Sequence, residues 1–278
     1  MSTYFTHLKP ALILLCVSWV LISATGFAAA RPVNIQYEVA QGNTASGGET
    51  GRGETLESIL ENYQNAVGGQ GAWKELNTLK ITGNMQSLGT VFKSTVVYKR
   101  PDKCRIDFNA EGMTFIESYD GTTPWQVGMV GKTRSPVPLE GKRAQELKQT
   151  CDFDGPLIDH KKKGHKLEYV GKEEVDGRAA YKVKVTYEND TVDTYYLDEK
   201  TYLPFMVKGT TSIQNKTIKS TTLINDFIQT GGIKIPYYYE FELEGVPTNE
   251  IFRVSTVELN PEIKEELFSM PRNVKDSY

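Results

Sequence analysis

The sequence predicts a mainly β protein built on one antiparallel sheet that curls towards a barrel. From Leu76 onward, apolar residues recur with a period of two, which is typical of strands with one apolar and one wetted face. Turn pairs such as Asp120-Gly121 and Asp176-Gly177 separate these runs, so neighbouring runs are expected to form hairpins. Roughly ten or eleven strands result, more than a flat sheet carries comfortably.

The first thirty residues are expected to be a signal peptide. An apolar run from Ala11 to Phe27 ends in Ala28-Ala29-Ala30, the small-residue pattern that signal peptidase accepts. The run is short for a membrane-spanning helix, and an uncleaved anchor is the alternative. Residues 31–54 read as a flexible linker because their small, polar stretches cannot bury apolar area. Residues 55–278 are therefore expected to form the β domain.

A helix is expected to open this domain. Apolar side chains recur at helical spacing on one face: Leu56, Ile59, Leu60, Tyr63 and Val67. Thr55 can cap the helix, and Gly68-Gly69 can end it.

The clearest strand lies in the run IKIPYYYEFELE from Ile233, where alternate residues from Ile235 to Leu243 are apolar. Shorter alternating runs occupy residues 79–86, 104–109 and 181–188. Residues 128–150 break the pattern with a Gly/Pro loop and a short helix carrying Leu139, Ala144 and Leu147. Such an insert must lie across a face or the mouth of the sheet, either as a mobile lid or as a fixed plug.

The composition narrows the function classes. The chain has a net charge of −3, which does not suit nucleic-acid binding through a basic face. No second apolar run is long enough to span a membrane. In an oxidising compartment a disulfide between Cys104 and Cys151 is permitted. It would close a loop of about 47 residues and contribute about 4 kcal/mol, but the spacing does not decide whether the two cysteines pair.

The stretch DHKKKGH at residues 159–165 is the segment that most resembles a chemical site. His160 and His165 stand five apart, which matches neither zinc-hydrolase spacing nor a strand pair, and neither cysteine has a ligand-type or catalytic setting. No GxSxG elbow occurs, and nothing singles out a pair of catalytic carboxylates. We therefore predict a basic turn, with residues 156–159 in a short helical turn and the lysines on a solvated edge. No enzyme activity, cofactor or metal is predicted.

The order of the segments resembles the LolA-like superfamily of outer membrane lipoprotein-sorting proteins, in its broad, poorly characterised branch. The resemblance rests on VGGQGAW, LKITGNM, YKRPDKCRIDF, the helical insert, DTYYLDEKTYLPFM and GGIKIPYYYEFELEG, and spans residues 56–271. It implies an open, strongly curved antiparallel half barrel covered by a few helices. It also implies a periplasmic location and an apolar concave face that binds acyl chains. No single functional residue carries over.

This resemblance predicts an exported periplasmic carrier or chaperone that holds a lipid or lipoprotein acyl chain and acts as a monomer. An exposed sixteen-carbon chain costs about 12 kcal/mol in water, so a soluble carrier needs a concave apolar surface. The residues expected to line it also suit an ordinary core: Val96, Tyr98, Ile106, Phe108, Phe115, Val183, Val185, Tyr237, Tyr239 and Phe241. The alternative is an envelope sensor or assembly module that binds a protein partner through the same fold.

Overall fold

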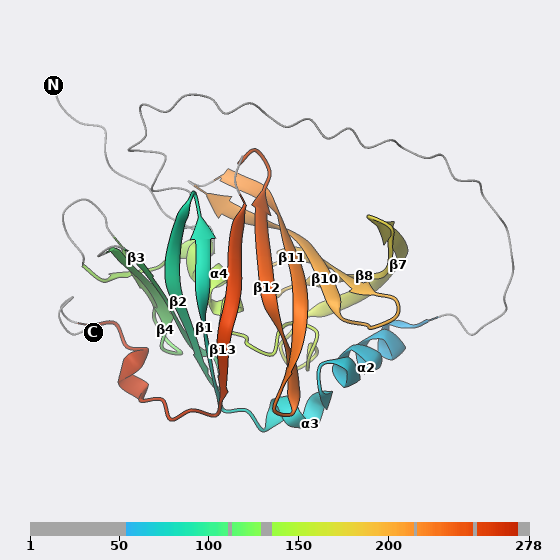
Figure 1. Ribbon diagram of the computed structural model, residues 1–278, viewed down its shortest axis with the longest axis horizontal. Coiled ribbons are helices and arrows are strands. Elements are labelled where there is room, and N and C mark those ends of the chain that lie inside the picture. The colour runs from blue at the N-terminus through green and yellow to red at the C-terminus, as the bar shows by residue number, and fades with distance from the viewer. Residues whose placement is uncertain (1–53, 111–112, 129–134, 214–215, 247–248, 272–278) are drawn as a thin grey trace, which may run out of the picture.

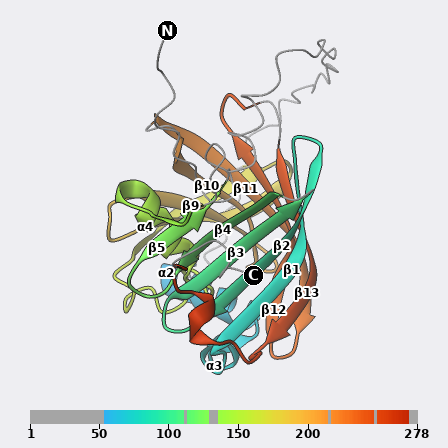
Figure 2. The same ribbon diagram turned by 90° about the vertical axis from the view of Figure 1, so that its left-hand side faces the viewer.

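The computed structural model describes residues 54–110, 113–128, 135–213, 216–246 and 249–271. Thirteen strands form one antiparallel sheet in the order β6-β5-β4-β3-β2-β1-β13-β12-β11-β10-β9-β8-β7 (Figure 1). The predicted mainly β fold is confirmed, and the sheet is open because β6 and β7 are its two edges. It curves strongly around its concave side (Figure 2).

The strands follow the chain mostly as hairpins. Their bounds are β1 Thr78–Ser87, β2 Thr90–Lys99, β3 Lys103–Ala110, β4 Met113–Tyr119, β5 Pro124–Val127, β6 Val137–Pro138, β7 Lys166–Val175, β8 Arg178–Thr186, β9 Val192–Asp198, β10 Pro204–Ile213, β11 Lys216–Thr230, β12 Ile233–Leu243 and β13 Glu250–Leu259. One long-range pairing, β1 with β13, joins the two halves of the sheet. At its centre, a side chain on Gly83 of β1 would overlap the carbonyl of Arg253 on β13, so this position needs glycine.

Two helices close one end of the sheet, which we call the helical end. Helix α2, Leu56–Ala66, begins at the Thr55 cap as predicted, with the Ser58 amide donating to Thr55 Oγ1 at 3.2 Å. Helix α3, Gly69–Lys74, follows directly and buries Trp73. Gly68, with φ +110°, allows the chain to pass close against Gly232 of the β11–β12 turn. The opposite end, where the β1–β2 turn lies, is called the hairpin end.

The C-terminal segment covers the outer face of β3–β5. The 3-10 helix Glu265–Leu267 leads to Phe268, whose side chain is fully buried. The Phe268 carbonyl accepts hydrogen bonds from Trp125 Nε1 at 2.7 Å and from Ser118 Oγ at 3.0 Å. The concave side of these strands is thus free for the third helix, α4, Gly141–Thr150, which lies beside β5 in Figure 2.

The segment between α4 and β7 differs from the prediction. Residues 156–159 form turns, and no helix is present there, because Leu157 and Ile158 are both buried in the core and Asp159 has the left-handed φ of 51°. The lysine edge is also only partly correct. Lys161 and Lys162 are exposed, but Lys163 is half-buried and turns inward.

Candidate functional site

The concave face of the sheet carries the main apolar cluster. Five of the residues predicted to line it are buried there: Ile106, Phe108, Phe115, Val183 and Val185. Four others are partly buried against the same cluster: Val96, Tyr98, Tyr239 and Phe241. Tyr237 is half-buried and is not part of the cluster. The structure thus brings nine of the ten together, and their contact with a lipid stays a prediction.

At the helical end this apolar face is already filled. Ile59 of α2 and Trp73 of α3 pack into the cluster, as do Leu157 and Ile158 from the segment after α4. Leu147, which faces the sheet from α4, is fully buried. Any ligand must therefore enter next to α4 or displace part of this covering.

Helix α4 is firmly attached on one side. The structure joins Cys151, at its C-terminal end, to Cys104 of β3 by a disulfide with a Cα–Cα distance of 5.0 Å. Near its N-terminal end, Arg143 forms a buried ion pair with Glu117 of β4. Arg143 also lies 3.4 Å from Glu146 in the same helix. These contacts attach α4, the C-terminal part of the insert, to β3 and β4.

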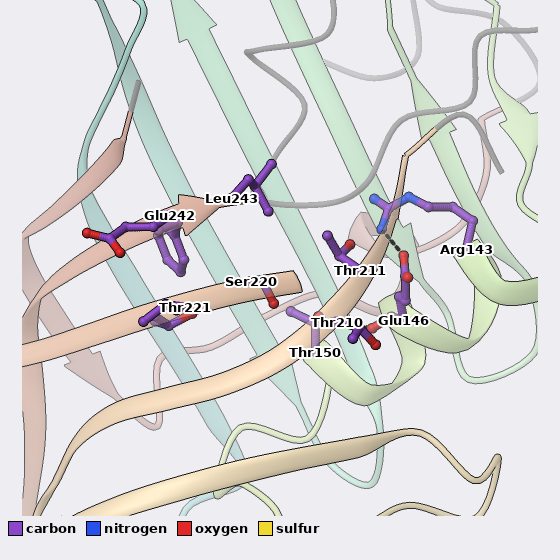
Figure 3. A pocket seen from close by; sticks show the side chains of 11 residues that line it. Arg143, Glu146, Thr150, Thr210, Thr211, Ser220, Thr221, Glu242 and Leu243 are labelled. Carbon is purple, nitrogen blue, oxygen red and sulfur yellow. Dashed lines mark hydrogen bonds and ion pairs between the residues drawn. The ribbon is translucent and has the colours of Figure 1, made fainter. Parts of the chain in front are cut away.

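On its other side α4 borders two cavities. A groove of about 990 Å³ separates it from the β8–β9 turn and β9, and this volume is at the upper end of the range for ligand pockets. A pocket of about 170 Å³ separates it from β10–β12. Figure 3 shows Arg143 and Glu146 on the α4 side of this pocket, with Ser220 and Glu242 on the strands. Glu146 and Thr150 border both cavities, so the two cavities lie on adjoining faces of the helix.

The floor of the groove connects to the apolar core. Tyr187 and Tyr195 line the groove and also pack against the main cluster. Tyr187 donates a hydrogen bond to Asp193 at 2.8 Å, and burial raises the pKa of the Asp193 carboxyl. The His165 ring stands edge-on to Tyr187 at 5.0 Å, and burial lowers the pKa of His165. The groove therefore has an apolar depth beneath a polar rim.

A charged network fixes the segment that borders the groove. Lys163 Nζ donates to Asp152 at 2.7 Å and to Asp154 at 2.8 Å, and Arg100 donates to Asp154 at 2.7 Å. Burial raises the pKa of Asp152 to about 7. For Asp154, hydrogen bonds from Asp152, Lys163 and Arg100 outweigh burial and hold its pKa at about 2. Of the two carboxyl groups, Asp152 therefore holds a proton more tightly than Asp154.

Neutral hydrogen bonds form a clasp across the groove. Gln149 of α4 donates from Nε2 to Asn189 Oδ1 at 3.2 Å and to Thr191 Oγ1 at 3.1 Å, both in the β8–β9 turn. Such neutral, partly exposed bonds are each weak, so this side of α4 is the easier one to open.

Gln149→Ala should open the groove without unfolding the protein. We expect a loss of no more than about 1 kcal/mol in the free energy of unfolding, because water replaces the two neutral partners. Amide exchange in α4 should rise up to about fivefold, measured by hydrogen–deuterium exchange. Lys142→Ala, at an exposed position of the same helix, is the matched control. Equal exchange in the two variants would show that the clasp does not hold α4.

Two residues of the DHKKKGH stretch make contacts that support the fold. Asp159 accepts a hydrogen bond from Gln70 of α3 at 2.7 Å, and Lys163 belongs to the charged network. Among the described residues, no three His, Cys, Asp or Glu side chains lie where they could hold a metal ion. Within the same part of the chain, no helix has the length and apolar character needed to cross a membrane.

The residues that sequence reasoning missed are Glu117, Gln126 and Arg143. Glu117 lies between Phe115 and Tyr119, which share its side of β4, so a carboxylate occupies an apolar position of the alternating pattern. Arg143 stands one helical turn before Leu147, on the apolar face of α4. A charge at each of these two apolar positions was the available signal.

Comparison with solved structures identifies the architecture. A DUF1329 family protein from Desulfovibrio piger aligns with a TM-score of 0.54 and 10% identity, over 77% of this chain and 97% of that one. A LolA superfamily protein from Nitrosomonas europaea aligns with a TM-score of 0.52 and 13% identity, over 78% and 98%. The chain has the LolA-like fold. A putative outer membrane lipoprotein-sorting protein domain from Vibrio parahaemolyticus aligns at 0.51 and 10% identity, over 77% and 95%.

The likeness is one of structure alone. No protein-family model matches the sequence. No curated protein matches it either. At 10–13% identity the LolA-like neighbours establish the arrangement of strands and helices, and the ligand must be argued from the residues of this chain.

Proposed function

We propose that this protein is exported to the periplasm and holds the acyl chain of a lipid or lipoprotein between α4 and the concave face of the sheet. The observation that carries the proposal is the placement of α4. The helix is attached to β3 and β4, while two neighbouring cavities separate it from β9–β12. The apolar cluster continues into the groove at Tyr187 and Tyr195. An acyl chain can therefore pass beneath the polar rim and reach apolar side chains.

The chemistry of the chain fits this role and location. Burying a sixteen-carbon chain recovers about 12 kcal/mol, far more than opening the neutral clasp costs. A disulfide between Cys104 and Cys151 suits an oxidising compartment such as the periplasm. The expected signal peptide, residues 1–30, and most of the expected linker lie outside the described residues. The proposal is one of binding, without catalysis and without a cofactor.

The exposed edge strand β7 does not suit a partner protein that binds by adding a strand to the sheet. The edge strand β7 exposes Val170, but it also carries Lys and Glu residues and an irregularity next to Gly171, features that discourage strand addition. We therefore keep partner binding as the outcome that a failed lipid test would favour.

Native mass spectrometry of the protein purified from its own envelope fraction, followed by lipid extraction, tests the proposal. We expect a bound mass that extracts as lipid. Ser220→Trp should reduce the bound lipid severalfold, because the larger side chain fills the pocket beside α4. Lys219→Trp, at the neighbouring exposed position outside the pocket, is the matched control. A bare mass together with no uptake of a fluorescent fatty acid would contradict the proposal and favour a protein-binding module.

A further inference from the structure

Within the described part of the chain, three buried polar atoms beneath α4 have no hydrogen-bond partner. They are Glu117 Oε2, Gln126 Oε1 and Arg143 Nε. Glu117 and Gln126 lie directly opposite each other on β4 and β5, so their side chains share one face of the sheet. Arg143 joins them through its ion pair with Glu117. Glu117 is only 1% exposed and Arg143 only 6%, and buried polar atoms in such positions call for a partner.

The three atoms define the chemistry of that partner. Glu117 Oε2 and Gln126 Oε1 need hydrogen-bond donors, whereas Arg143 Nε needs an acceptor. A carboxylate or phosphate supplies only acceptors and would be repelled by Glu117. An ammonium group supplies only donors and would be repelled by Arg143. A hydroxyl group both donates and accepts without adding charge, so it matches the site.

The pocket beside Arg143 also suits a ligand that carries hydroxyl groups. Arg143 lines the 170 Å³ pocket, whose opposite wall carries the hydroxyl groups of Thr211, Ser220 and Thr222. Cavities of about 150 Å³ admit a molecule as large as benzene, so there is room for a head group with more than one hydroxyl. Phe241 and Leu243 border the same pocket and lead back towards the apolar face.

We infer that Glu117, Gln126 and Arg143 bind the hydroxyl-bearing polar end of a neutral lipid such as a monoacylglycerol. The inference rests on the proposed function, because it assigns the head group of the same ligand. The acyl chain lies against the apolar concave face, and the hydroxyl groups enter through the pocket that Arg143 lines and satisfy the three polar atoms. This site discriminates between lipids by their head groups, which the apolar face cannot do.

Binding of three palmitoyl compounds at pH 8 tests the inference, since they share one chain and differ in the head. Monopalmitoylglycerol should bind about tenfold more tightly than methyl palmitate, which has no hydroxyl, and more tightly than palmitate. Equal affinities would overturn the inference and leave the proposed function standing. If none of the three binds, both fail.

Two variants tie the preference to these residues. Gln126→Met should reduce the preference for monopalmitoylglycerol at least threefold without lowering Tm, because Gln126 Oε1 has no partner to lose. Gln86→Met, at an exposed glutamine of β1, should leave the preference unchanged. Glu117→Gln should shift the preference towards palmitate, because the charge of Arg143 loses its partner carboxylate. An unaltered preference in Gln126→Met would overturn the assignment even if Glu117→Gln does not fold.

Discussion

Replacing Arg143 with Met is expected to lower the free energy of unfolding by about 3–5 kcal/mol. The substitution leaves the Glu117 carboxylate buried on the concave face without its cation, and a buried charge without a partner is strongly destabilising. Urea denaturation monitored by tryptophan fluorescence measures the loss. Lys142→Met, at the neighbouring exposed position of α4, should change stability by less than about 0.5 kcal/mol.

The double variant Glu117→Met with Arg143→Met separates the missing charge from lost packing. Removing both partners takes away the desolvation cost together with the attraction, so most of the lost stability should return. A double variant as unstable as Arg143→Met would show that packing of the arginine, and not its charge, holds α4 in place.

The pH dependence gives a second signature of the same pair. Burial raises the pKa of Glu117 to about 7, against the opposing effect of Arg143. The folded state then holds this proton more tightly than the unfolded state between about pH 4.5 and 7, so the contribution of Glu117 to stability falls as pH rises through that window. Asp152 acts in the same direction, but it does so in every variant.

The cost of Arg143→Met should therefore depend on pH. Near pH 5 Glu117 is protonated and neutral in the variant, so most of the decrease in the free energy of unfolding should disappear. At pH 8 the full decrease should be present. Urea midpoints at the two pH values measure the difference. The double methionine variant should not show this difference, and a penalty that is the same at both pH values would mean that the charge of Glu117 does not change between them.

Alternation along the strands was enough to predict the sheet and most of its apolar face, because a pleated strand turns every second side chain to the same side. Tyr237 shows where this reasoning stops. It lies two residues before Tyr239 and is therefore expected on the same side of β12, yet it stays outside the main cluster. Asp226 of β11, with φ 56°, interrupts the pairing of β11 with β12 beside this position, and no alternation within β12 reveals an irregularity in its neighbour.

The candidate site was harder to predict because its contacts join distant segments. Glu117 and Arg143 meet only when α4 lies on β4 at one particular rotation, and Gln149 reaches Asn189 only across the groove. Sequence spacing reports which side chains share a face within one element, not which elements meet. The segment 159–165 stands out in the sequence for its two histidines, but in the structure its Lys163 forms ion pairs with Asp152 and Asp154.

Replacing both Cys104 and Cys151 with Ala is expected to lower the free energy of unfolding by about 4 kcal/mol, since the disulfide closes a loop with a sequence separation of 47. For a folded region of this size the loss corresponds to a Tm lower by about 8–16 °C. Calorimetry measures it. The wild-type chain, reduced in denaturant and refolded with free thiols, is the control because it loses the link and keeps both side chains.

The variant without Cys104 and Cys151 also tests how far α4 can move. Both cysteines are buried, so a reductant should reach them only after local opening. With the disulfide intact, the C-terminal end of α4 stays on β3, and opening is confined to the side of the Gln149 clasp. Without it, amide exchange should rise along the whole helix, while the β11–β12 pair exchanges as before at conditions where the sheet remains folded. Exchange confined to the N-terminal turn of α4 in both proteins would show that Leu147 and the Arg143 ion pair fix the helix, and that the disulfide stabilises the fold without setting the width of the groove.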